Sequence, residues 1–138
     1  MFKKICVVLS CLLVLSGTYL FSRTPIFNDY SSVFEVYLNS ADSTAEFKTV
    51  NISEFKFLSG VRGESFKTDK DNFDLQDFLK SFSANLVFTE QIEHGVSYFA
   101  FSKDIKYRTT LSNKPINLHV FIGEDNVVVG SPIISGSF

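Results

Sequence analysis

An apolar run without a charged residue lies near the N-terminus and constrains this chain more than any other feature. Lys3 and Lys4 precede the run, which extends over 17 residues from Ile5 to Phe21. A cationic stretch before an apolar segment is typical of a signal peptide, and about 17 residues is the lower limit for crossing a membrane. Because lysines favour the cytoplasmic side, we predict that residues 1–23 are a signal peptide or signal anchor. Residues 24–138 are then one extracytoplasmic domain.

Removal of this segment would decide between a membrane protein and a secreted one. The small residues Ser16, Gly17 and Thr18 are followed by bulky ones, and the run contains no Ala-x-Ala cleavage pattern. We therefore expect an uncleaved single-pass anchor in the cell membrane, with secretion as the alternative. Cys11 does not favour a lipoprotein, because the bulky Leu9 stands where a lipobox requires a small residue.

The domain that follows is acidic and contains no cysteine. Thirteen Lys and Arg include Lys3, Lys4 and Arg23, so ten remain against fifteen Asp and Glu, and the net charge from residue 24 onward is −5. This charge does not favour nucleic acid or anionic lipid as a partner. Both cysteines, Cys6 and Cys11, lie in the apolar run, which excludes a disulfide or a thiol nucleophile in the domain.

One segment has the hydrophobic period of a helix. Leu75, Phe78, Leu79 and Phe82 recur at helical spacing. Asn72 or Asp74 can cap the N-terminus of this helix, and Asp77 and Lys80 suit its dipole. The spacing therefore predicts a helix of roughly nine residues that packs through its apolar face.

The remaining segments favour strands joined by short turns. β-rich or alternating stretches occur at 32–38, 64–67, 85–91, 96–102, 107–111, 116–122 and 127–134. We read Thr24–Asp29 as a linker, leave 47–57 open between strand and helix, and expect a positive φ at Gly95 in a hairpin turn. We predict the α+β class, with an antiparallel sheet of about four to six strands and one main helix on one face.

Three patterns are typical of functional sites, yet each has a simpler explanation. Aspartates between Asp69 and Asp77 suggest a calcium loop, but Phe73, Asp74 and Lys80 stand where such a loop needs a ligand, a glycine and a glutamate. They are better explained as a solvated loop and a helix cap. His94, in a turn, and His119, on the polar side of an alternating strand, are the two histidines, which is too few for a catalytic zinc site.

The third pattern resembles penicillin-recognising enzymes. Ser53-x-x-Lys56 and Ser83-x-Asn85 match two of their motifs, but Lys48-Thr49-Val50 lacks the final glycine of the third. We therefore assign no catalytic, cofactor-binding or metal-binding residue, and we expect no cofactor.

The C-terminal strands resemble a known family. Ile116–Val120 and Val127–Ile134 are similar to the end of YwmB-like proteins. The resemblance implies an exported or membrane-anchored protein of spore-forming Gram-positive bacteria, a TATA-box-binding-protein-like fold, and a role in sporulation. It implies no catalytic residue.

These observations favour a non-enzymatic, membrane-tethered domain that binds a protein or a cell-envelope component. A flat apolar surface on the open face of the sheet would support this hypothesis. A small-ligand or peptide sensor would instead need a phenylalanine-lined groove between helix and sheet. A cell-envelope hydrolase would need Asp, Glu, Ser or His side chains that converge in one cleft.

Overall fold

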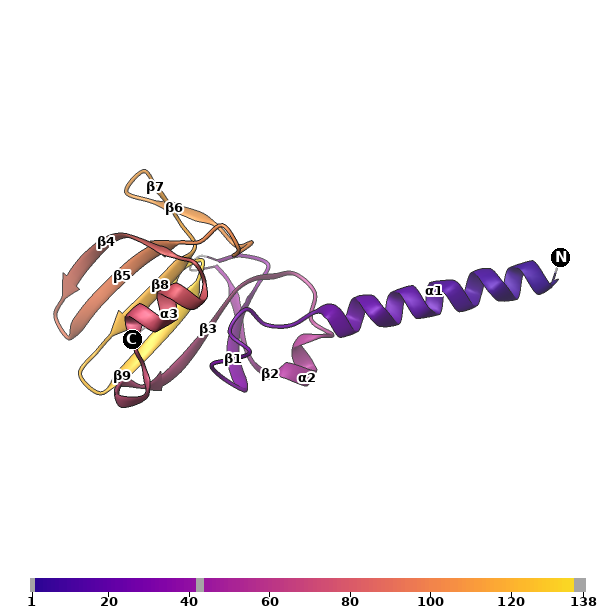
Figure 1. Cartoon of the computed structure of the whole chain (residues 1–138), viewed down its shortest axis with the longest axis horizontal. Helices are drawn as coiled ribbons and strands as arrows, with labels where there is room; N and C mark the ends of the chain where they lie inside the picture. Colours follow the sequence, from indigo (N-terminus) through magenta and orange to yellow (C-terminus); the bar gives the residue numbers. More distant parts are fainter. Residues whose placement is uncertain (1, 42–43, 136–138) are drawn as a thin grey trace.

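The computed structural model describes residues 2–41 and 44–135 and begins with a long apolar helix, α1 (Phe2–Ser22). This helix extends straight away from the domain (Figure 1). Its 21 residues, at about 1.5 Å each, match the thickness of a membrane core. The stretch Lys3–Leu20 is apolar enough to cross a membrane, and none of it is buried. The predicted N-terminal apolar segment is thus confirmed, in a form shared by membrane spans and signal sequences.

The domain is built on a seven-stranded antiparallel sheet. Its strands, in spatial order, are β2 (Glu46–Asn51), β1 (Val33–Leu38), β3 (Val61–Asp69), β9 (Asn126–Ser131), β8 (Leu118–Ile122), β5 (Gly95–Phe101) and β4 (Asn85–Ile92). A small hairpin of β6 (Thr109–Leu111) and β7 (Lys114–Ile116) forms a second sheet. The α+β class is confirmed. The main sheet exceeds the expected four to six strands because β2, which falls mostly in the stretch 47–57 that the sequence left open, pairs with β1 as an edge strand.

Three short helices accompany the sheet: α2 (Ile52–Phe55), the 3₁₀ turn η1 (Lys70–Asn72) and α3 (Leu75–Ser81). The predicted main helix is α3, which lies across one face of the sheet (Figure 1). Asp74 caps it as expected, since its Oδ1 accepts a hydrogen bond of 2.8 Å from the Asp77 amide. Phe78 and Leu79 are buried beneath it, so packing rather than length stabilises this short helix.

Aromatic rings fill the space between α3 and the sheet. The ring centroid of Phe27 lies 5.1 Å from that of Phe66 and 5.8 Å from that of Phe82. The centroids of Phe78 and Phe82 are 5.1 Å apart. Phe27 is fully buried, so the prediction of a linker at Thr24–Asp29 is wrong. This segment instead extends the core, because the buried Glu64 carboxylate accepts hydrogen bonds from the Ile26 and Phe27 amides.

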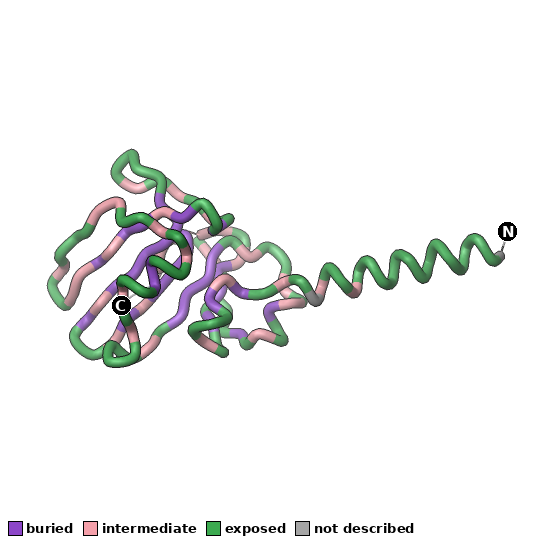
Figure 2. Tube along the Cα trace, viewed as in Figure 1, coloured by how far each residue is buried: buried purple, intermediate pink, exposed green. Residues whose placement is uncertain are grey.

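At its centre, the opposite face of the sheet is closed by the chain itself. After β9 the chain folds back over Gly130, where an added Cβ would lie 2.8 Å from the Ile134 nitrogen. The Ile134 amide donates to His119 Nδ1 over 3.2 Å, and His119 is only 5% exposed. The prediction of a half-buried strand with His119 on its polar side is therefore wrong. Figure 2 shows buried residues concentrated in the central strands, while α1 is exposed along most of its length.

The turn between β4 and β5 occurs where it was predicted, but Gly95 is there for another reason. Gly60, with φ +71°, is the one glycine with a positive φ among the described residues. An added Cβ at Gly95 would lie 2.3 Å from the Ile122 carbonyl oxygen. Close approach of β8, rather than a left-handed backbone, thus requires glycine at this position.

Candidate functional site

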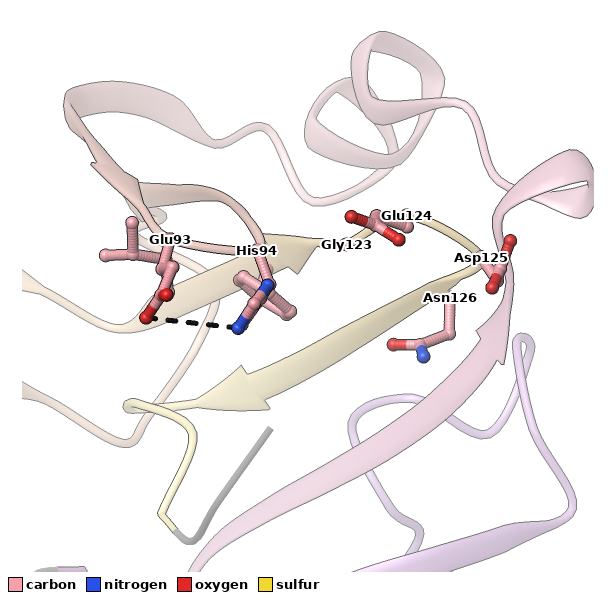
Figure 3. Close-up of a pocket in the computed structure, with 8 residues that line it drawn as sticks. Glu93, His94, Gly123, Glu124, Asp125 and Asn126 are labelled. Atoms are coloured by element: carbon pink, nitrogen blue, oxygen red, sulfur yellow. Dashed lines mark ion pairs between the residues drawn. The ribbon is translucent and has the colours of Figure 1, made fainter.

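One pocket lies at one end of the sheet, between two turns. It has a volume of about 580 Å³, and the β4–β5 turn contributes Glu93 and His94 while the β8–β9 turn contributes Glu124 and Asp125. Figure 3 shows that the Glu124 and Asp125 carboxylates point in different directions and that His94 pairs with its neighbour Glu93. The nearest atoms of that pair, His94 Nε2 and Glu93 Oε2, are 3.9 Å apart.

This end pocket has the residue types of an acid–base site but not its environment. The side chains of His94 and Glu93 are 77% and 88% exposed. Water solvates such groups and weakens every charge interaction they make, whereas catalytic acids and bases are held in sites that shift their pKa. No group of three or more His, Cys, Asp or Glu in residues 2–41 and 44–135 is arranged to hold a metal ion. The arrangement therefore indicates a solvent-exposed surface at this end of the sheet rather than an acid–base site.

A second groove lies where α1 joins the domain, and its walls are cationic. Tyr19 comes from the last turn of α1 and Arg23 directly follows this helix. Arg62 comes from β3, and Lys106 and Tyr107 from the loop before β6. The volume of this junction groove is about 460 Å³. An adjoining hollow of about 280 Å³ shares Arg62, Lys106 and Tyr107 and adds Arg108. Among the described residues, neither lining contains an Asp or a Glu.

Aromatic rings support the cations of the junction groove. The Lys106 Nζ lies 4.9 Å from the centroid of Tyr107, and the Arg108 Cζ lies 5.5 Å from that of Phe101. The Arg23 Nη1 donates over 3.3 Å to the Lys56 carbonyl, which ties the end of α1 to the segment after α2. Among the described residues, no carboxylate lies within ion-pair distance of these cations, although the charge of Lys106 acts on the buried Glu64 carboxylate. Their charge is therefore available to an anion.

A buried carboxylate lies behind the junction groove. Glu64 is fully buried, and its Oε2 has no hydrogen-bond partner in the structure, while Oε1 accepts two backbone amides. Burial raises the pKa of Glu64 to about 7. The hydrogen bonds from the two amides and the charge of Lys106 act in the opposite direction and only partly offset this rise. Burial also raises the pKa of Tyr107, and the charge of Glu64 raises it further.

The other histidine is a structural residue of the closed sheet face. His119 Nε2 lies 3.1 Å from the Ser97 hydroxyl, and its ring stacks on Phe99 with centroids 4.3 Å apart. Because Nδ1 accepts from the Ile134 amide, Nε2 carries the proton and donates to Ser97. Burial lowers the pKa of His119 to about 4, so the ring is neutral near pH 7. The two histidines are not brought together, since His94 lies in an exposed turn.

The remaining sequence patterns take local roles. Asp74 caps α3, while Asp69 and Asp71 are exposed around η1. The Ser53 hydroxyl donates over 2.6 Å to Asn51 Oδ1 and so belongs to the cap of α2. Ser83 follows α3 with φ +49°, which is a turn conformation.

Sequence reasoning missed both Glu64 and the junction groove. Arg62 lies just before the strand predicted at 64–67, Lys106 just before the strand predicted at 107–111, and Arg108 within that strand. The available signal was a local excess of cations at 103–108 and at Arg23, in a domain that is acidic as a whole. Net charge averages over such an excess and therefore hides it.

Comparison with known proteins does not identify the chain. No protein-family model matches it, and neither a curated protein nor a solved structure does. The YwmB-like resemblance therefore stays a prediction, and the function has to be argued from the molecule.

Proposed function

We propose that this chain is a membrane-anchored extracytoplasmic domain, without enzymatic activity, that binds a protein or a cell-envelope component. The observation that carries the proposal is α1, an exposed apolar helix of membrane-spanning length joined to a folded domain. An apolar helix with no protein surface to cover needs a membrane or a translocation channel. A role in sporulation is proposed from the YwmB-like resemblance.

The domain itself supports binding rather than catalysis or sensing. The end pocket is solvated, and its carboxylates diverge. The space between α3 and the sheet, where a ligand sensor would need a groove, is filled by packed phenylalanine rings. The centre of the sheet face expected to carry an apolar partner surface is covered by residues 132–135. The binding surface is therefore expected elsewhere, and the junction groove is the strongest candidate.

Anchoring is tested by extraction and mass. Membranes from cells that express the full chain are washed with alkaline carbonate, and the intact mass of the retained protein is measured. We expect a retained product that still contains residues 1–23. A soluble product that begins near residues 19–25 would contradict the anchor and leave a secreted domain.

Topology is tested by labelling, because the domain has no cysteine of its own. Glu93→Cys places one thiol in the β4–β5 turn, where the native side chain is 88% exposed. If the domain lies outside, an impermeant maleimide should label this variant in intact cells. The wild-type chain should not react, because its Cys6 and Cys11 lie in α1, within the membrane. Labelling of Glu93→Cys only after lysis would place the domain inside.

A further inference from the structure

We propose that the junction groove binds the phosphate headgroup of an anionic phospholipid of the membrane that holds α1. The inference rests on the proposed anchoring and names the ligand of that same membrane-proximal surface. The local positive charge of the groove would attract anionic lipid, although the net charge of the domain, −5, does not favour such a partner.

Charge complementarity is the first argument. Arg23, Arg62 and Lys106 line one groove, and no carboxylate is among its described lining residues; Arg108 continues the row in the adjoining hollow. A guanidinium presents a planar fork of N–H donors that matches two phosphate oxygens, and a lysine adds a point charge. The aromatic faces beneath Lys106 and Arg108 hold these cations without using their charge in an ion pair.

Position is the second argument, and it separates a lipid from a soluble anion. Tyr19 and Arg23 belong to the final turns of α1 and to the residue after it, so a spanning helix places the groove at the depth of the headgroups. Phe57 is 75% exposed, the most exposed of the domain's large apolar side chains in the described part. It follows Lys56, whose carbonyl accepts the Arg23 hydrogen bond. An exposed ring beside the end of a spanning helix suits the membrane interface.

The full chain in neutral detergent tests the assignment. Phosphatidylglycerol and phosphatidylcholine are titrated separately, and bound lipid is counted by native mass spectrometry. The wild type should bind phosphatidylglycerol more tightly than phosphatidylcholine. Arg62→Ala/Lys106→Ala should lose about fivefold in phosphatidylglycerol affinity for each cation removed, roughly 25-fold together. The loss should shrink as salt is raised.

The control removes two cations elsewhere. Lys48→Ala/Lys67→Ala changes exposed lysines of β2 and β3, neither of which lines the junction groove. It should keep the wild-type preference, and thermal unfolding of all three proteins should show that each is folded. Equal loss in both double variants would mean that only total charge matters and would overturn the site.

Two further arms separate the remaining outcomes. Inorganic phosphate is added at about 10 mM, a concentration well above the dissociation constant of a moderately tight anion site. It should leave bound phosphatidylglycerol in place. If it displaces the lipid, the ligand is a soluble phosphate and the lipid assignment fails. A membrane-embedded chain that binds both lipids equally would defeat this inference alone, whereas a cleaved, soluble chain would defeat the anchoring itself.

Discussion

Glu64 and His119 are buried side chains on opposite faces of the main sheet, and their pKa values are shifted in opposite senses. The pKa of Glu64 is raised from 4.5 to about 7, and that of His119 is lowered from 6.5 to about 4. Burial is the main cause of both shifts, because it penalises the charged form of either group. Each shift makes folding stability depend on pH.

The two groups should oppose one another between about pH 4.5 and 6.5. As pH rises from 4.5 to 7, unfolded Glu64 ionises while folded Glu64 keeps its proton, so the free energy of unfolding falls. As pH falls from 6.5 to 4, unfolded His119 takes a proton that the folded ring does not, so the free energy of unfolding also falls. Glu64→Gln should therefore stabilise the protein at pH 8, by about 3 kcal/mol, and change little at pH 4.5.

Urea unfolding at a series of pH values checks this prediction. His119→Gln should remove the acid-side loss, so its difference from the wild type should change between pH 6.5 and 4 and stay constant above pH 7. Glu90→Gln makes the matched carboxylate-to-amide change at an exposed position of β4 and serves as the control. A Glu64→Gln difference that does not vary from pH 4.5 to 8 would show that Glu64 is charged in the folded state.

Neither buried group could be recognised from the sequence. Alternation along 116–122 placed His119 on the polar side, and a strand with one polar face is the ordinary reading of that pattern. Its burial depends on residues 132–135, and that of Glu64 depends on residues 26 and 27, which are remote in the chain. Local periodicity carries no information about which distant segment returns to cover a strand.

At the scale of elements, α3 should depend on its two buried side chains. Leu79 is 7% exposed and belongs to the core that Phe27, Phe66 and Val120 share. Leu79→Ala should lower the free energy of unfolding by about 2–5 kcal/mol, because a buried leucine leaves a cavity. Gln76→Ala, at an exposed position of the same helix, should change it by less than about 0.5 kcal/mol. Equal effects of the two substitutions in urea unfolding would mean that α3 does not pack through Leu79.

The acidic stretch before α3 should not be a calcium site. Asp74 is engaged in capping, and Asp69 and Asp71 are exposed. A ligand at a hundredfold excess over its dissociation constant would stabilise the folded state by about 2.7 kcal/mol. We therefore expect millimolar calcium to leave the melting temperature unchanged, apart from a small screening effect that magnesium reproduces. A calcium-specific rise that Asp71→Ala abolishes would refute this expectation.

The elements that the sequence specified are those with strong local signals. The helix at 75–82 has a capping aspartate and a clear period, and the turn at 92–95 separates two β-rich stretches. The order of strands in the sheet and the place of the junction groove have no such signal. The groove draws on α1, β3 and the loop at 106–107, which are far apart in the chain and are brought together by the fold.

At the scale of the whole molecule, α1 and the domain should be separable. The α1 side chains from Lys3 to Leu20 are not buried by the domain, so their removal takes away no core contact. A chain that begins at Arg23 retains the hydrogen bond to the Lys56 carbonyl and the buried Phe27. Its melting temperature should therefore match that of the full chain in detergent within a few degrees, since about 1 kcal/mol moves the melting temperature of a domain this size by only about 4–8 °C.

A further truncation provides the matched comparison. A chain that begins at Asn28 also loses Phe27 and the two backbone amides that donate hydrogen bonds to Glu64. It should be much less stable, because a buried phenylalanine contributes about 3–5 kcal/mol and the Glu64 carboxylate would be left buried without partners. Thermal unfolding followed by circular dichroism distinguishes the two chains. If the chain from Arg23 fails to fold, α1 supplies stability that its exposure does not account for. If the chain from Asn28 is as stable as the longer one, Thr24–Asp29 is the linker that its proline and polar residues first indicated.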